Sequence, residues 1–256
     1  MQLIILGVGS SAGTPVIGCN CATCTSDNPR NKRTRCSSAV IMPGGEVILI
    51  DTGPDLRSQA LREGIKRVDA VLYTHTHADH IHGIDDLRAF CQLQRQQIPL
   101  YGSRDTTEHI ASKFGYTLRE PRDFWELPAL SINQINGPFQ LFDTTVTPIP
   151  VKHGRSNTYG YRIGNMAYIT DASEIPEASL ALLQGLDVLL LDCLRYQPHH
   201  THINLEQSLA YASHIKAKDT YLIHMTHEME YESLTGQLPP SVHVAYDGLR
   251  LNPGTA

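Results

Sequence analysis

The chain has 256 residues, of which 41% are hydrophobic, and its formal net charge at pH 7 is −5. This length suits one large domain with a full core, and the negative charge argues against nucleic acid as a partner. The sequence contains no run of 18 apolar residues, so it predicts no membrane span. The N-terminus lacks the pattern of a signal peptide. We therefore expect a single cytoplasmic domain over residues 1–256.

The N-terminal part combines a strand, a glycine-rich loop and a cysteine cluster. Residues 2–6 predict the strand, and the loop at 7–15 matches neither G-x-G-x-x-G nor a Walker A motif. Cys19, Cys21 and Cys24 follow in a C-x-C-x2-C pattern. Thiols stay reduced in the cytoplasm, so this clustering favours a metal over disulfides. Three thiolates can fill three corners of a zinc tetrahedron, and the fourth ligand must come from elsewhere.

Apolar runs between turn residues predict alternating strands and helices in the rest of the chain. Residues 116–143 give mixed signals and predict no element. Asn204, with Gln207 three residues later, predicts a capped helix start. Strands are predicted at 37–42, 47–50, 70–73, 98–101, 145–151, 159–163, 166–170, 186–191, 220–223, 242–245 and 249–251. Helices are predicted at 56–64, 87–93, 106–114 and 176–183 and after Asn204.

Many of the predicted strands end on a residue type that binds metals. One such residue at a strand end is usually structural, but six ends of this kind indicate a shared edge with a site along it. The residues concerned are Asp51, His75 and His77, His153, Asp171, Asp192 and His224.

The densest group lies in residues 74–80, directly after the apolar run 70–73. His75 and His77 alternate, so in an extended segment they face the same side. Asp79 and His80 follow a turn and can face a second point. Imidazole and carboxylate are the ligands that borderline divalent metals prefer, so each pair can serve one metal.

The motif His75-x-His77-x-Asp79-His80, followed by residues 153, 171 and 224, resembles the dinuclear metal signature of the metallo-β-lactamase superfamily. The turn at 51–53 fits the first motif of that superfamily. The resemblance implies an α/β (α+β) fold, an αββα sandwich with the metal site at one edge between the two sheets. It also implies two active-site cations, zinc or manganese: one is bound by His75, His77 and His153, the other by Asp79, His80 and His224, and Asp171 bridges them. We expect Asp51 to hold a ligand histidine instead of a metal.

Within the superfamily, the chain resembles the PhnP-type phosphodiesterases. Cys19, Cys21 and Cys24 with His227 are similar to the structural zinc site of that group, which would pin the loop at about residues 7–36. His227 could instead be a partner of His224.

The resemblance also assigns catalytic residues. His202 matches the catalytic histidine of the group, and by analogy with tRNase Z, Asp192 orients it. The expected catalytic residues are His202, Asp79 and Asp192. The alternative for His202 is a surface histidine beside its neighbours His199 and His200.

The implied function is hydrolysis of a small phosphodiester, including a cyclic ribose phosphate, by a protein that could form a homodimer. A metal-bridging hydroxide would attack phosphorus, and His202 would protonate the leaving alkoxide as a general acid. One alternative is a tRNase Z-like endoribonuclease, although the basic arm that would hold tRNA is missing between Asp171 and His224. The other is a non-hydrolytic PqqB-like member or a metal-binding protein of this fold, and a pure metal-binding protein would not need His202.

Overall fold

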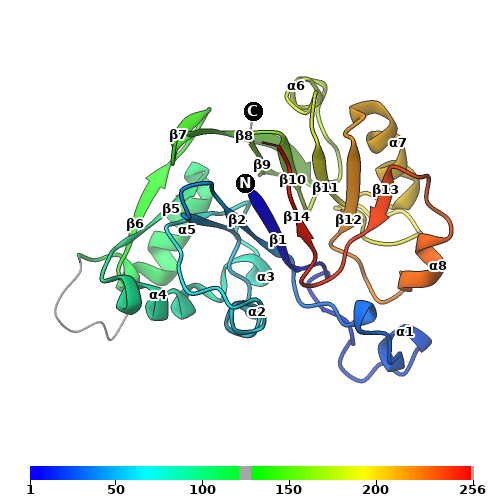
Figure 1. The fold of residues 1–256 in the computed structure, drawn as a ribbon, viewed down its shortest axis with the longest axis horizontal. Coiled ribbons are helices and arrows are strands. Elements are labelled where there is room, and N and C mark those ends of the chain that lie inside the picture. Colours follow the sequence, from blue (N-terminus) through cyan, green and yellow to red (C-terminus); the bar gives the residue numbers. More distant parts are fainter. Residues whose placement is uncertain (121–127, 255–256) are drawn as a thin grey trace.

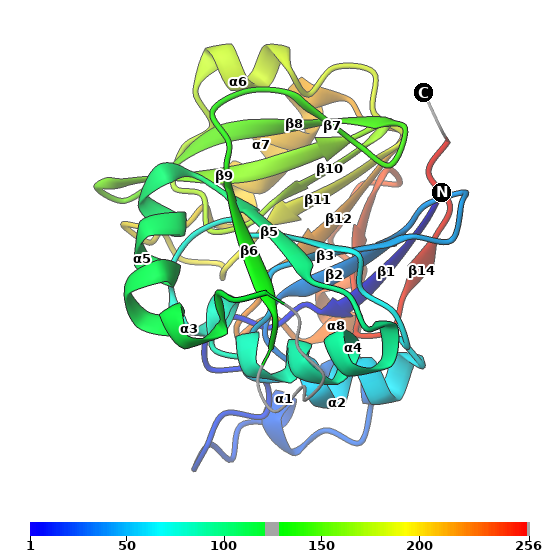
Figure 2. The same cartoon turned by 90° about the vertical axis from the view of Figure 1, so that its left-hand side faces the viewer.

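The computed structural model describes residues 1–120 and 128–254. Within these residues, two seven-stranded sheets face each other and helices cover their outer sides (Figure 1 and Figure 2). In spatial order, the first sheet contains β14 (Arg250–Leu251), β1 (Gln2–Gly7), β2 (Ser37–Ile41), β3 (Val47–Ile50), β4 (Ala70–Leu72), β5 (Ile98–Gly102) and β6 (Leu130–Gln134). The second contains β13 (Val242–Val244), β12 (Asp219–Ile223), β11 (Val188–Asp192), β10 (Met166–Ile169), β9 (Ser156–Ile163), β8 (Thr144–His153) and β7 (Phe139–Leu141).

The helices connect these strands and pack on the outer faces. The α-helices are α1 (Ala22–Thr25), α2 (Leu56–Glu63), α3 (Ala78–Ile81), α4 (Leu87–Gln94), α5 (Arg104–Phe114), α6 (Glu177–Ala181), α7 (Leu205–Ile215) and α8 (Tyr231–Thr235). Three single turns of 3-10 helix are η1 (Pro29–Asn31), η2 (Ile84–Asp86) and η3 (Gly115–Thr117) in the described part of the chain. None of the helices seen there has both the length and the apolar character needed to cross a membrane.

Side chains alternate between layers along the strands, as the pleat requires. In β1, Leu3 and Ile5 belong to the core between the two sheets, together with Tyr168 of β10. Ile4 and Leu6, the residues between and after them, pack in a second cluster with helices α2 and α4. A third cluster lies between the second sheet and helices α6 and α7. The layers are therefore helix, sheet, sheet, helix, which confirms the predicted αββα sandwich.

The predicted strands and helices correspond to elements of the structure, with ends that shift by a few residues. Residues 116–143, for which the sequence predicted nothing, contribute the edge strands β6 and β7, while 121–127 lie outside the described residues. Strand β6 has the sequence LSINQ and only its first residue is buried, so its apolar pattern is weak. Helices α1, α3 and α8 have four or five residues, which is too short to show a helical period.

The strand directions bring the metal-type residues to one edge of the sandwich. Strand β3 runs parallel to β4, and β10, β11 and β12 are parallel to one another. Strand β8 is antiparallel to β9, which is antiparallel to β10, so β8 runs in the same direction as β10. The carboxyl ends of these strands meet at the same edge, as the recurring strand-end pattern predicts.

Three of these strand ends have an unusual backbone. Asp51 and His224 directly follow β3 and β12, with φ values of 62° and 59°, and Asp171 is the second residue after β10, with a φ of 51°. Residues other than glycine rarely adopt this left-handed region, and each instance costs about 1–3 kcal/mol. The surrounding structure therefore imposes a turn that directs each side chain away from its strand and into the edge.

Helix α3 packs very closely against the chain that follows β3. Thr52 donates its N–H to the carbonyl of His80 (2.7 Å), and Gly83 donates to the carbonyl of Thr52 (2.8 Å). A Cβ atom at Gly53 would lie 2.2 Å from the carbonyl oxygen of Asp79. Glycine at position 53 is thus required for α3 to sit where it does.

We predict that Gly53→Ala destabilises the protein by about 1–3 kcal/mol or more, because the new methyl group meets backbone and cannot be relieved by a side-chain rotation. Urea unfolding measures the change. Gly137→Ala is the matched control, since a Cβ atom there meets nothing within 4 Å. Equal unfolding midpoints for the two variants would contradict the close packing described here.

Candidate metal centre

Two groups of histidine and aspartate side chains converge at the sandwich edge. The first contains His75, His77, His153 and Asp171, whose ligand atoms all lie within 4.8 Å of one another. The second contains Asp79, His80 and His224, whose ligand atoms also lie within 4.8 Å of one another. All members are buried except His77, whose side chain is exposed. The structure thus brings together every residue that the sequence assigned to the dinuclear site.

Asp171 lies between the two groups. Its Oδ1 atom is 3.7 Å from Nε2 of His75 and 3.9 Å from Nε2 of His153. Its Oδ2 atom is 3.1 Å from Nε2 of His80 and 3.4 Å from Nε2 of His224. Each carboxylate oxygen therefore faces one group, which is the arrangement of a bridging ligand.

A buried network around Asp51 fixes the orientation of two of the histidines. Asp51 accepts from the backbone N–H of Thr74 (2.8 Å), from its hydroxyl (2.8 Å) and from Nδ1 of His80 (2.6 Å). Because the Thr74 hydroxyl donates to Asp51, it accepts from Nδ1 of His75 (3.0 Å). Both rings then carry their proton on Nδ1, and their Nε2 lone pairs point into the site. Asp51 thus contacts His80 directly and His75 through Thr74, which is the position that its predicted role requires.

His153 is oriented in the same way by a backbone group. Its Nδ1 atom donates to the carbonyl of Thr201 (2.8 Å), so its Nε2 also presents a lone pair. A carbonyl oxygen gives no signal in the sequence, and neither Thr201 nor Thr74 was identified from it.

These atoms fit two divalent cations. Nε2 of His75, His80 and His224 is buried without a hydrogen-bond partner among the described residues. Two ligand atoms placed about 2.0–2.2 Å from one tetrahedral ion lie roughly 3.4 Å apart. The contacts of Asp171 with the histidines, 3.1 to 3.9 Å, bracket this value. Lone pairs that face each other at such distances repel unless a positive charge lies between them.

In the protein alone, a proton can supply that charge at His80 and His224, whereas burial lowers the pKa of His75 and of His153. Desolvation lowers the pKa of His224, but Asp171 and Asp79 outweigh it and raise the pKa to about 9. Desolvation also lowers the pKa of His80, but Asp171 and Asp51 outweigh it and raise that pKa well above its ordinary value. Protons and cations therefore compete for the same Nε2 atoms.

His202 lies at the side of this centre and is 8% exposed, so it is not a surface histidine. Its Nδ1 atom is 3.1 Å from Oδ2 of Asp192, and its Nε2 atom is 3.8 Å from Oδ1 of Asp171. The ring stacks on that of His224 at 4.8 Å. Asp192 also accepts from the N–H of Ala172 (2.9 Å), which fixes the carboxylate. Asp192 therefore orients Nε2 of His202 toward the metal centre.

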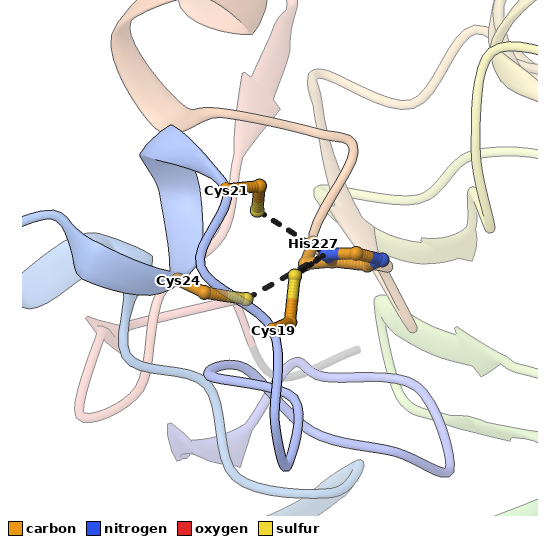
Figure 3. A group of neighbouring side chains, drawn as sticks. All are labelled: Cys19, Cys21, Cys24 and His227. Atoms are coloured by element: carbon orange, nitrogen blue, oxygen red, sulfur yellow. Dashed lines mark hydrogen bonds between the residues drawn. The ribbon is translucent and has the colours of Figure 1, made fainter.

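The three cysteines meet His227, as Figure 3 shows. The Sγ atoms of Cys19, Cys21 and Cys24 lie 3.3, 3.3 and 3.6 Å from Nδ1 of His227. Around one zinc ion, sulfur at about 2.3 Å and nitrogen at about 2.0 Å would be roughly 3.6 Å apart. The backbone N–H of Cys24, and then His227, lower the pKa of the Cys21 thiol to about 6. His227 thus faces the sulfurs, and a thiolate ligand is available near neutral pH.

Comparisons with known proteins agree with this geometry. Residues 46–225 match the family described as Beta-lactamase superfamily domain. A solved structure described as a new diphosphatase from the PhnP family superposes with a TM-score of 0.92 at 42% identity, covering 99% of this chain and 98% of that one. Coenzyme PQQ synthesis protein B from Methylobacterium radiotolerans is 30% identical over 75% of this chain and 72% of its own length.

A further relative is the octanoyltransferase of Porphyromonas gingivalis, which is 37% identical over 97% of this chain. The chain spans about half the length of that protein, 51%. Together with the family match and the full-length structural similarity, these findings show that the chain belongs to the beta-lactamase superfamily, in the group of the PhnP-family diphosphatase.

Proposed function

We propose that this chain is a hydrolase of small phosphoric diesters that works with two divalent cations, zinc or manganese. The observation that carries the proposal is the position of Asp171, whose two carboxylate oxygens each face one group of histidines. When bound there, two cations would neutralise phosphate oxygens and activate water as the nucleophile. The net charge of −5 supports a small substrate instead of nucleic acid.

The side chains of this protein supply orientation and a proton. Asp51 and Thr74 hold His75 and His80 in the tautomer that ligates through Nε2. Hydrolysis breaks a P–O bond, and the electron pair stays on the leaving oxygen, which then needs a proton. We assign this donation to Nε2 of His202, with Asp192 holding the opposite nitrogen.

A second candidate function is hydrolysis of a diphosphate, since the PhnP-family relative is described as a diphosphatase. The chemistry differs only in the leaving group, which would be a phosphate instead of an alkoxide. A PqqB-like role without hydrolysis is the rival, and the buried pair of His202 and Asp192 favours hydrolysis over it because this geometry suits proton transfer. The octanoyltransferase activity named for the Porphyromonas relative belongs to a protein about twice as long as this chain.

We also propose that Cys19, Cys21, Cys24 and His227 hold one structural zinc. Support comes from the convergence of all three sulfurs on one ring nitrogen and from the lowered pKa of Cys21. A closed four-ligand site leaves no position for substrate, so the expected role is stability.

Asp79→Ala is predicted to remove one cation and to lower turnover of bis-p-nitrophenyl phosphate by about 100-fold or more, because one group loses its only carboxylate. Metal content by mass spectrometry and steady-state kinetics test this together. The control is Asp27→Ala, which removes an exposed aspartate far from the site in sequence. Turnover that survives Asp79→Ala would refute the two-cation hydrolase.

His202→Ala should lower kcat by about 10²–10⁴-fold for a diester with an alkyl leaving group, which needs a proton. The loss should be much smaller for p-nitrophenolate, which leaves without one. The two substrates are compared on the same metal-loaded preparation. An equal loss on both would show that His202 is not the proton donor.

Cys21→Ser is predicted to reduce metal content from about three to about two ions per chain and to lower the unfolding temperature. Cys91→Ser serves as the control, since that buried thiol donates to the carbonyl of Ala129 and lies outside both metal groups. It should lower stability without changing the metal count. Three ions retained in Cys21→Ser would exclude the structural zinc.

A further inference from the structure

A cavity of about 310 Å³ lies between the metal centre and the cysteine cluster. His202 and His224 are among its lining residues, and so is His227. Ser10 and His199 also line it, and no acidic residue is among its described lining residues. The candidate proton donor is thus part of the wall of this cavity.

His199 presents a fixed hydrogen-bond donor in this cavity. Thr201 donates its backbone N–H (3.3 Å) toward Nδ1 of His199, and its hydroxyl lies 3.0 Å from the same atom. A backbone N–H can only donate, so Nδ1 is the acceptor and Nε2 carries the proton. Desolvation and the neighbouring His202 lower the pKa of His199.

The loop that carries His199 is held by its own hydrogen bonds. Arg195 donates from Nη2 to the carbonyl of Pro198 (2.9 Å) and from Nε to that of Gln197 (3.2 Å). Asn204, which caps α7, donates to the carbonyl of Tyr196 (3.0 Å). Arg195 also lines the cavity and contributes a positive charge. The donor and the charge are therefore preorganised before a ligand binds.

The other side of the metal centre differs. A cavity of about 300 Å³ beside His77 and His153 is lined by the carboxylate of Asp105 as well as by His109. An anionic group is repelled by a carboxylate, so the Arg195 side is the better place for an anion.

We propose that the cavity next to His202 is the leaving-group subsite, that it selects an oxygen-rich anionic leaving group, and that Nε2–H of His199 binds one of its oxygens. The proposal rests on the hydrolase function above. Water adds to phosphorus, the P–O bond to the leaving group breaks, and the leaving oxygen takes the proton of His202. Donor and acceptor must come within about 2.6–3.2 Å, so the leaving group has to lie on the side of His202.

The test compares two substrates on metal-loaded protein. ADP-ribose yields an anionic, oxygen-rich leaving group, whereas bis-p-nitrophenyl phosphate yields p-nitrophenolate. His199→Phe should raise KM for ADP-ribose about tenfold or more, because a hydrogen bond to a charged group is lost. KM for bis-p-nitrophenyl phosphate should change less than about twofold, because its leaving group does not use the hydrogen bond from His199. His199→Gln, which restores an N–H donor, should recover part of the loss.

The matched control is His214→Phe, which replaces an exposed histidine near the end of α7. It should leave both substrates unchanged. An equal loss on both substrates in His199→Phe would mean that the residue only supports the fold, and no loss on either would exclude contact with the leaving group. Both results overturn the proposal.

Failure of the hydrolase function would be seen separately. If metal-loaded wild type turns over neither substrate, the proposed function fails, and calorimetry with ribose 5-phosphate then tests the cavity alone. Binding that weakens about tenfold in His199→Phe and stays unchanged in His214→Phe supports the anion subsite. Equal binding by all three proteins overturns it.

Discussion

The buried carboxylate of Asp51 is the interaction on which the metal centre depends. It is fully inaccessible to solvent and joins three segments: the end of β3, the end of β4 through Thr74, and helix α3 through His80. Burial raises the pKa of Asp51, whereas His80 and Thr74 oppose that shift. An unpaired carboxylate in this position would be very costly, so the charge is tolerated only when all three segments are in place. Folding of the edge and orientation of the ligands are therefore one event.

The strained backbone at the same edge has a related origin. The left-handed turns at Asp51, Asp171 and His224 cost energy that a surface loop would release by relaxing. Here each turn follows a buried strand and its side chain is held by other segments: Asp51 contacts Thr74 and His80 beyond the neighbouring strand β4, and Asp171 reaches His75 and His80 across the gap between the sheets. The two sheets thus hold the ligands from both sides, and the packed core between them keeps the distances fixed.

The sequence predicted the parts of this site that depend on residue type and order. The run from His75 to His80 and the metal-type residues at strand ends are visible because buried strands are apolar and a polar residue after them stands out. The orientation of the ligands was not predictable, since it comes from Thr74 and from a carbonyl at Thr201. Strands β6 and β7 were not predicted for another reason. Edge strands are half exposed, so their pattern of apolar and polar residues resembles that of a loop.

The cysteine cluster and the metal centre share one segment of backbone. This segment links the stability of the cysteine cluster to the shape of the proposed leaving-group cavity beside His202. His224 directly follows β12, and three residues later His227 faces the cysteines. Between them, Met225 donates to the carbonyl of Val8 (2.9 Å) and accepts from the N–H of Ser10 (3.1 Å). Arg33, itself 2% exposed, donates to the carbonyls of Thr226 (3.0 Å) and Met229. The loop that forms one wall of the cavity is thus hydrogen-bonded to the segment that carries His224 of the candidate metal centre. Loosening the cluster would move that wall relative to His202 while the two sheets, and the ligands they carry, stay where their own core holds them.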